Sequence, residues 1–252
     1  MNNQFVAQIN NFFAGKRRRI LVVFALLLAL ILLLPPALNI ASAFKEERRV
    51  AAKIKNNPAW SELYSAAKEG DKLLKKDEDN LEMYLSAGFR WKSVADATTE
   101  AVFYRNALDV YDKAIKKFGD RNYLPFLNAA NVLRYLKEFE RADRYYLEAI
   151  KSNPGEAGIY IARAELMRYD LKKTPEEIRA FYQKGLAVLV GQEVLRLAAD
   201  YVSYLVETEQ FAEALQMYKK LALIMPGHEP YQAAIKELEE KLANQTASQL
   251  KE

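Results

Sequence analysis

The hydrophobic positions in the middle of the chain recur at helical spacing and predict two helices joined by a short turn. Within residues 123–156 the second helix carries Ala142, Tyr146 and Ala149 on one face, and Pro154 closes the unit. The first helix carries a matching stripe made of Phe126, Ala129, Ala130 and Leu133. Side chains three and four residues apart share one face of a helix, so the small residues permit close approach and the aromatic ring fills the space beside them.

The same stripe of small, aromatic and small residues recurs before and after this unit. The further copies are Ala107, Tyr111 and Ala114; Ile178, Tyr182 and Gly185, in which the isoleucine is a departure; and Ala214, Tyr218 and Leu221. Pro154 and Pro226 lie 72 residues apart, which matches two units of about 34 residues with about four inserted. The pattern resembles the tetratricopeptide repeat (TPR), a helix–turn–helix unit with the same small, aromatic and proline positions. Phe126 and Leu133 depart from it, since they replace the usual tryptophan and tyrosine.

The resemblance implies an all-α fold, a right-handed α-solenoid of antiparallel helix pairs, over residues 58–243. The helix expected at residues 58–75 is either a degenerate first repeat or a cap on the N-terminal end of the array. A helix rich in Lys and Glu at residues 230–243 is expected to cover the last apolar face, as a terminal cap does in a solenoid. Residues 244–252 are expected to form a disordered tail.

The turns between the helices also carry predictions. The turn around Lys137, Glu138 and Phe139 parallels the one around Glu209, Gln210 and Phe211. Residues 168–175 are expected to form an enlarged turn. Its last residues, Thr174 to Glu177, have the spacing of a capping box that starts a helix at Pro175.

A long apolar run near the N-terminus predicts a membrane segment. Residues 20–34 are fifteen consecutive residues without a polar side chain, and a basic cluster at 16–19 precedes them. If the helix continues through the next two prolines, residues 20–43 span roughly 36 Å, which is enough to cross a bilayer. If the helix stops at residue 34, the segment instead has the form of a secretory signal cleaved at Ala43. We favour the uncleaved anchor, because the run is long and rich in leucine.

The basic cluster also sets the expected orientation. The positive-inside rule keeps residues 1–19 as a cytoplasmic tail and sends the juxtamembrane linker, residues 44–57, across the cytoplasmic membrane. The repeat domain is then expected on the periplasmic or extracellular side, in the cell envelope of a bacterium.

The net charge of +4 comes from the same N-terminal stretch. Seven of the 37 basic and two of the 33 acidic residues fall within residues 1–49, which leaves 30 basic and 31 acidic residues in the remainder. The repeat domain therefore gives no electrostatic reason to expect nucleic-acid binding. Cysteine is absent, which excludes disulfides, thiolate catalysis and cysteine-based metal sites.

The sequence predicts neither an enzyme nor a cofactor. The only histidine, His228, follows a Pro-Gly turn, where it lacks the partners of a general base or a metal ligand. A glycine-rich phosphate loop and a nucleophile elbow are both missing. We expect no catalytic, cofactor-binding or metal-binding residues.

The resemblance places the expected binding surface on the concave groove that the first helix of each repeat lines. The candidate partner-binding residues, just off the packing stripe, are Asn128, Asn131, Arg134, Tyr135, Glu165, Arg168 and Tyr169. Asparagine is costly inside a helix, and hydrogen bonding to the backbone of an extended peptide is one reason to find it there. An ordinary polar surface is the alternative.

These expectations together indicate a membrane-tethered TPR scaffold that binds protein or peptide partners and assists the assembly or secretion of an envelope complex. Two alternatives stay open. The chain could be a non-catalytic accessory subunit of an envelope enzyme or secretion channel, or a periplasmic chaperone released by cleavage near Ala43.

Overall fold

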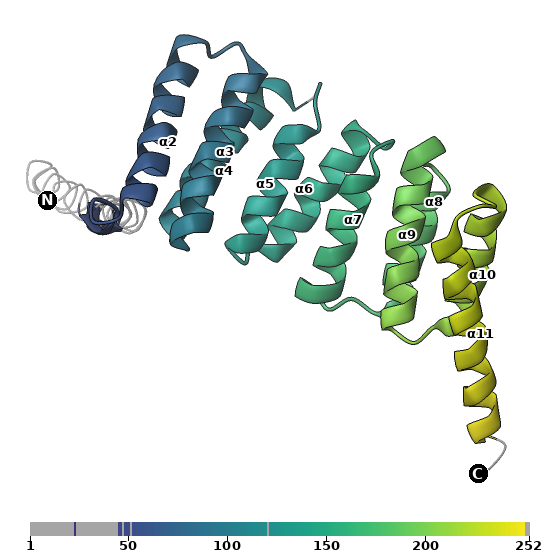
Figure 1. Ribbon diagram of the computed structural model, residues 1–252. Helices are drawn as coiled ribbons and strands as arrows, with labels where there is room; N and C mark the ends of the chain where they lie inside the picture. Colours follow the sequence, from purple (N-terminus) through teal and green to yellow (C-terminus); the bar gives the residue numbers. More distant parts are fainter. Residues whose placement is uncertain (1–22, 24–44, 47, 51, 120, 250–252) are drawn as a thin grey trace, which may run out of the picture. The chain divides into compact units, whose positions relative to one another are not determined.

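The structure is a computed structural model that describes residues 23, 45–46, 48–50, 52–119 and 121–249. Within these residues the regular secondary structure is entirely helical (Figure 1). The helices are α2 (Pro58–Lys76), α3 (Leu81–Thr98), α4 (Ala101–Phe118), α5 (Leu124–Tyr135), α6 (Phe139–Ser152), α7 (Ala157–Glu165), the π-helical turn η1 (Leu166–Asp170), α8 (Pro175–Leu186), α9 (Gly191–Glu207), α10 (Phe211–Ile224) and α11 (Glu229–Gln249).

The predicted membrane segment, residues 20–43, lies outside the described residues apart from Val23. Across the part of the chain that the structure describes, every helix is too short or too polar to span a bilayer. The membrane segment and the orientation therefore stay predictions.

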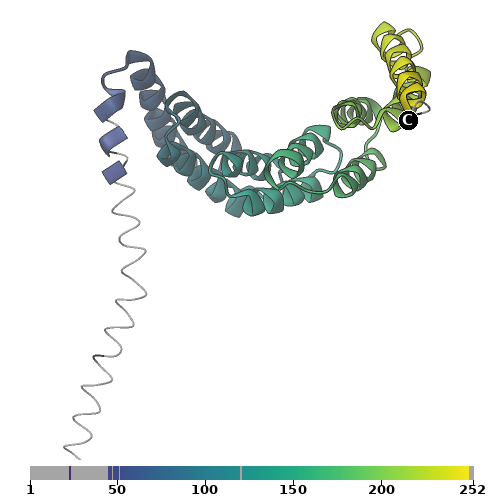
Figure 2. The same ribbon diagram turned by 90° about the horizontal axis from the view of Figure 1, so that it is seen from below.

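The chain divides into two compact units, Met1–Glu62 and Leu63–Glu252. In the second unit the helices follow one another as pairs: α3 with α4, α5 with α6, α7 and η1 with α8, and α9 with α10 (Figures 1 and 2). The final helix α11 packs against α10. The all-helical, TPR-like arrangement that the sequence predicts is thus confirmed within this unit.

The aromatic residue at the centre of each stripe lies in the core of its pair. Tyr111, Tyr146 and Tyr182 are at most 1 % exposed. Tyr218 in the last pair is half-buried, and its ring packs 5.9 Å from that of Tyr231 on α11. The repeated tyrosines are therefore packing residues that hold the two helices of each pair together.

Two glycines, Gly185 of the third stripe and Gly88 of α3, allow an unusually close approach between helices. A Cβ at Gly185 would lie 2.6 Å from Leu197 Cδ2 and 2.8 Å from Tyr160 Cδ1. A Cβ at Gly88 would overlap the ring of Tyr111. In the first pair, the Tyr111 ring of α4 therefore lies directly against the backbone of α3.

The turns of the second and fourth pairs have the same structure. Lys137 and Glu209, which are 72 residues apart, both have left-handed backbone conformations, with φ of +60° and +57°. The N–H of the following residue donates to a carbonyl five residues earlier: Glu138 to Leu133 at 2.9 Å, and Gln210 to Leu205 at 2.8 Å. This is the hydrogen bond of a helix C-cap that ends in a left-handed residue. The predicted parallel between the two turns is confirmed.

The third pair differs from the prediction at the end of its first helix. Instead of a turn that starts at Arg168, the helix continues as η1 to Asp170, with the Leu171 N–H donating to the Leu166 carbonyl at 2.9 Å. The predicted capping box is present, since Thr174 Oγ1 accepts from the N–H of Glu177 at 3.2 Å. The enlarged turn is therefore shorter than expected, and its first residues belong to a π-helical turn.

The last helix also runs further than predicted. α11 continues to Gln249, whereas the sequence analysis expects a disordered tail from residue 244. Residues 244–249 contain neither proline nor glycine, the residues that most strongly end a helix.

Candidate partner-binding groove

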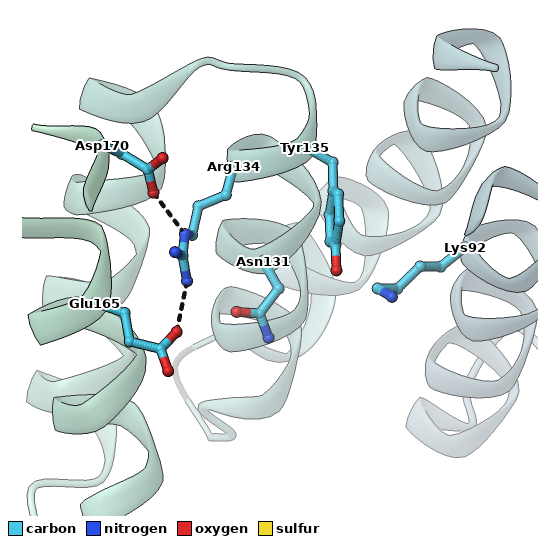
Figure 3. Close-up of a pocket in the computed structure, with 6 residues that line it drawn as sticks. All are labelled: Lys92, Asn131, Arg134, Tyr135, Glu165 and Asp170. Carbon is cyan, nitrogen blue, oxygen red and sulfur yellow. Dashed lines mark hydrogen bonds and ion pairs between the residues drawn. The ribbon is translucent and has the colours of Figure 1, made fainter. Parts of the chain in front are cut away.

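The candidate site is a cavity of about 550 Å³ between the first helices of three successive pairs (Figure 3). Its lining residues are Lys92 of α3; Asn131, Arg134 and Tyr135 of α5; Glu165 of α7; and Asp170 of η1. We call this cavity, together with Arg168 and Tyr169 of η1 and with Asp200 and Glu207 of α9, the inner groove. Four of the seven candidate residues line the cavity. Asn128, Arg168 and Tyr169 are described by the structure but are not among the residues that line it.

The side chain of Asn131 already has a partner within the fold. The buried hydroxyl of Tyr146 donates to Asn131 Oδ1 at 2.5 Å. Burial raises the pKa of Tyr146 to about 12, so this hydroxyl keeps its proton and stays a donor at neutral pH. The amide nitrogen of Asn131 is still a donor that a partner in the groove could use.

Arg134 joins two neighbouring pairs across the groove. Its Nη1 lies 3.1 Å from Glu165 Oε2, and its Nε lies 3.0 Å from Asp170 Oδ2 (Figure 3). A guanidinium has several N–H donors in fixed directions, so one arginine can donate hydrogen bonds to two carboxylates. Arg134, which the sequence predicts as a partner-binding residue, therefore also fixes α5 to α7 and η1.

Tyr135 is the most exposed of the candidate partner-binding residues on α5. Its ring is 56 % exposed and stacks on the ring of Tyr104, with centroids 4.8 Å apart and planes inclined by 6°. Lys92 Nζ lies 5.0 Å from the centre of the Tyr135 ring and 2.6 Å from Asp96 Oδ2. An exposed ring that is fixed in place offers a contact surface at low cost in conformational entropy.

The π-helical turn directs its side chains toward the neighbouring pair on each side. Asp170 pairs with Arg134 of α5, and Arg168 pairs with Glu207 of α9. The Arg168 guanidinium also lies 4.8 Å from the centre of the Tyr169 ring. Single π-turns within α-helices are frequent at functional sites, because one extra residue changes the direction of the side chains that follow.

The groove continues onto α9 through Asp200. Its Oδ2 accepts a hydrogen bond from the buried hydroxyl of Tyr182 at 2.6 Å. Burial raises the pKa of Asp200, and the negative charges of Glu165 and Glu207 add to this rise, although the hydrogen bond from Tyr182 and the positive charge of Arg168 oppose it. Asp200 therefore shares the electrostatic environment of Arg168 and of both glutamates.

Lys92 and Asp170 line the cavity but are not among the residues predicted from the sequence. Lys92 could have been found by applying the groove spacing of α5 to the helix that begins at Leu81. Asp170 had no such signal, because it was expected in a turn. His228, which was expected not to be a site, lies with its ring centroid 4.0 Å from that of Tyr231. The described residues include no group of three His, Asp or Glu side chains that could hold a metal ion.

Comparisons with known proteins give similarity to TPR structures at low sequence identity. The chain is 15% identical to YrrB, described as a TPR protein with an unusual peptide-binding site, over 71% of this chain and 86% of that one, with a TM-score of 0.47. It is 16% identical to MamA, over 73% and 92%, with a TM-score of 0.48. It is 16% identical to a tetratricopeptide repeat protein from Parabacteroides merdae, over 82% and 77%, with a TM-score of 0.49.

The chain matches no protein-family model. A search of curated proteins likewise found no match.

Proposed function

We propose that this protein is a membrane-tethered scaffold that binds an extended peptide or a protein segment in the inner groove. The observation that carries the proposal is the convergence of polar and aromatic side chains from three successive pairs on one cavity of about 550 Å³. A cavity of this size suits a few residues of a peptide better than a whole folded domain.

The groove has the properties of a preformed site. Arg134 is held by two carboxylates, Asn131 by Tyr146, and Tyr135 by stacking on Tyr104. Side chains that are fixed before binding lose little conformational entropy when a partner arrives. A partner therefore binds without a large rearrangement of the helices.

The tether would be the apolar segment at residues 20–43, with the groove on the extracytoplasmic side. An anchor of this kind raises the effective concentration of the groove near other membrane components. In this role the protein would bring together or assist the assembly of an envelope complex. Extraction of membranes with alkaline carbonate and measurement of the intact mass test the tether. A carbonate-soluble protein, or a mature chain that begins at Phe44, would exclude it.

The groove itself is tested by affinity capture of the full-length protein from detergent-solubilised membranes. The test variant is Tyr135→Ala, which removes the exposed ring. The matched control is Leu147→Ala on α6, because Leu147 is 44 % exposed and lies outside the residues that line the cavity. We expect one stoichiometric partner with the wild type and the control, and its loss with Tyr135→Ala. Equal recovery of every captured protein by all three, or capture of none by the wild type, would refute the proposal.

A further inference from the structure

The two arginines of the inner groove are less accessible than two of the glutamates they pair with, although Asp170 is as little exposed as Arg134. The side chain of Arg168 is 9% exposed and that of Arg134 is 23% exposed, whereas Glu165 is 45% and Glu207 is 56% exposed. Each arginine is already paired with a carboxylate of the groove. A ligand that enters the groove therefore meets carboxylates before it meets a guanidinium.

Acidic side chains also outnumber basic side chains in the inner groove. The charged side chains that line the cavity, together with Arg168 and the ion-pair partners of these residues, are Lys92, Arg134 and Arg168 on the basic side, and Asp96, Glu165, Asp170 and Glu207 on the acidic side. The excess lies toward α9, where Glu165, Asp200 and Glu207 form what we call the carboxylate row. Arg134 is shared between two carboxylates, and Asp200 accepts its hydrogen bond from a tyrosine.

Two exposed aromatic rings accompany the carboxylate row. Tyr135 is 56 % exposed beside the cavity, and Tyr169 is 52 % exposed beside Glu207, to which its hydroxyl donates at 3.3 Å. A cation of the protein already lies over each ring, Lys92 at Tyr135 and Arg168 at Tyr169, and the exposed remainder of the ring offers apolar surface to the aliphatic parts of long side chains. Carboxylates beside such rings are chemically matched to lysine and arginine.

We propose that the partner of the inner groove is an extended segment rich in lysine or arginine, whose basic groups lie along the carboxylate row and whose aliphatic stems pack against the exposed parts of Tyr135 and Tyr169. This inference depends on the proposed function, because it names the chemical class of the ligand for the same groove. An acidic segment is the opposite choice. It would have to displace the carboxylates from Arg134 and Arg168 and leave them without partners, which is costly in a half-buried site.

The test uses three fluorescein-labelled peptides of equal length that alternate glycine with lysine, glutamate or glutamine and carry one tyrosine. Binding to the full-length protein in a non-ionic detergent is measured by fluorescence anisotropy. The variant combines Glu165→Gln with Glu207→Gln, which preserves the shape of both side chains and one acceptor oxygen in each, and removes the charge. The control is Glu240→Gln, which removes the charge of an exposed glutamate on α11.

We expect the lysine peptide to bind more tightly than the glutamine and glutamate peptides. The double variant is expected to weaken it about tenfold, and the control is expected to leave it unchanged. Added salt should weaken the binding, because the contacts are between partly exposed charges. A circular dichroism melting curve that matches the wild type shows that the double variant is folded. Single variants of Glu165 and Glu207 replace it if it is not.

The inference is wrong if the lysine peptide binds no more tightly than the other two, if it does not bind at all, or if the double variant binds it as well as the wild type does. If partner capture still depends on Tyr135, these results would refute only the chemical class of the partner, and the groove would remain the proposed binding site. Failure of the capture experiment as well would remove both proposals.

Discussion

The hydroxyl groups of Tyr146 and Tyr182 occupy equivalent places in their helix pairs but donate to acceptors of different charge. Tyr146 donates to the neutral amide of Asn131, whereas Tyr182 donates to the carboxyl group of Asp200. Substitution by phenylalanine removes each hydroxyl and keeps the ring, which is 0 % exposed in both residues. The two variants therefore compare one hydrogen bond to a neutral group with one to a titratable group.

The expected losses differ because hydrogen bonds to charged groups contribute more. Tyr146→Phe should lower the free energy of unfolding by about 1 kcal/mol, the usual net contribution of a neutral hydrogen bond. Tyr182→Phe should lower it by about 2 kcal/mol at neutral pH, because a charged, half-buried acceptor loses its donor. Protonation of Asp200 in acid removes that charge, so the loss for Tyr182→Phe should then fall to about 1 kcal/mol.

The sign of the pH effect follows from the pKa of Asp200. Burial raises this pKa in the folded state, so the group contributes stability that is fully present below its unfolded pKa and is lost as the pH rises through its folded pKa. The hydrogen bond from Tyr182 lowers the pKa, and its removal raises the pKa further. The stability difference between the wild type and Tyr182→Phe must therefore grow with pH.

Urea unfolding followed by far-ultraviolet circular dichroism, in buffers from acidic to neutral pH, measures both effects. Tyr146→Phe is the control, since its acceptor does not titrate. The reasoning fails if the two variants lose the same stability at neutral pH, or if the loss for Tyr182→Phe does not depend on pH.

Three further predictions concern packing, a turn and the carboxylate row. Gly88→Ala should lower stability by about 1–2 kcal/mol, because the overlap with Tyr111 outweighs a gain of about 1 kcal/mol in helix propensity. Gly70→Ala, where the nearest atom is the flexible Cδ of an arginine at 3.0 Å, should instead be neutral or stabilising, and urea midpoints compare the two. Lys137→Gly should raise the unfolding free energy by about 0.5–1 kcal/mol, since it relieves a left-handed conformation; thermal melting tests this. Asp200→Asn keeps an acceptor without the charge and should be at least as stable as the wild type at neutral pH, with a flatter pH–stability curve.

The repeated helix pairs could be predicted because their signals are local. Each stripe requires one small residue, one aromatic and another small residue at helical spacing, and buried positions such as Ala142, Tyr146 and Ala149 follow directly. The 72-residue offset between two prolines also predicted the matching turns at Lys137 and Glu209. A packing arrangement that repeats along the chain requires the same residue types at the same spacing, and the sequence shows this as a repeating pattern.

The π-helical turn could not be predicted in the same way. Its side chains contact residues far away in the sequence, with Asp170 on Arg134 and Arg168 on Glu207. Such long-range pairs leave no periodic pattern, and the stretch reads locally as the start of a turn. Arg134 could therefore be placed on the groove from the sequence, whereas its second carboxylate partner, Asp170, could not.

The two tyrosine hydroxyls show why groove residues can be named from sequence more easily than their roles. Tyr146 donates to a residue 15 positions earlier in its own pair, whereas Tyr182 donates to a residue 18 positions later in the next pair. In both cases the core supplies a donor to a polar residue of the groove, and Asn131 and Asp200 are therefore held in place by the fold. Substitution of these residues, or of Arg134, changes stability and binding together. Only the more exposed side chains, Tyr135, Glu165 and Glu207, can separate recognition of a partner from stability of the helix array.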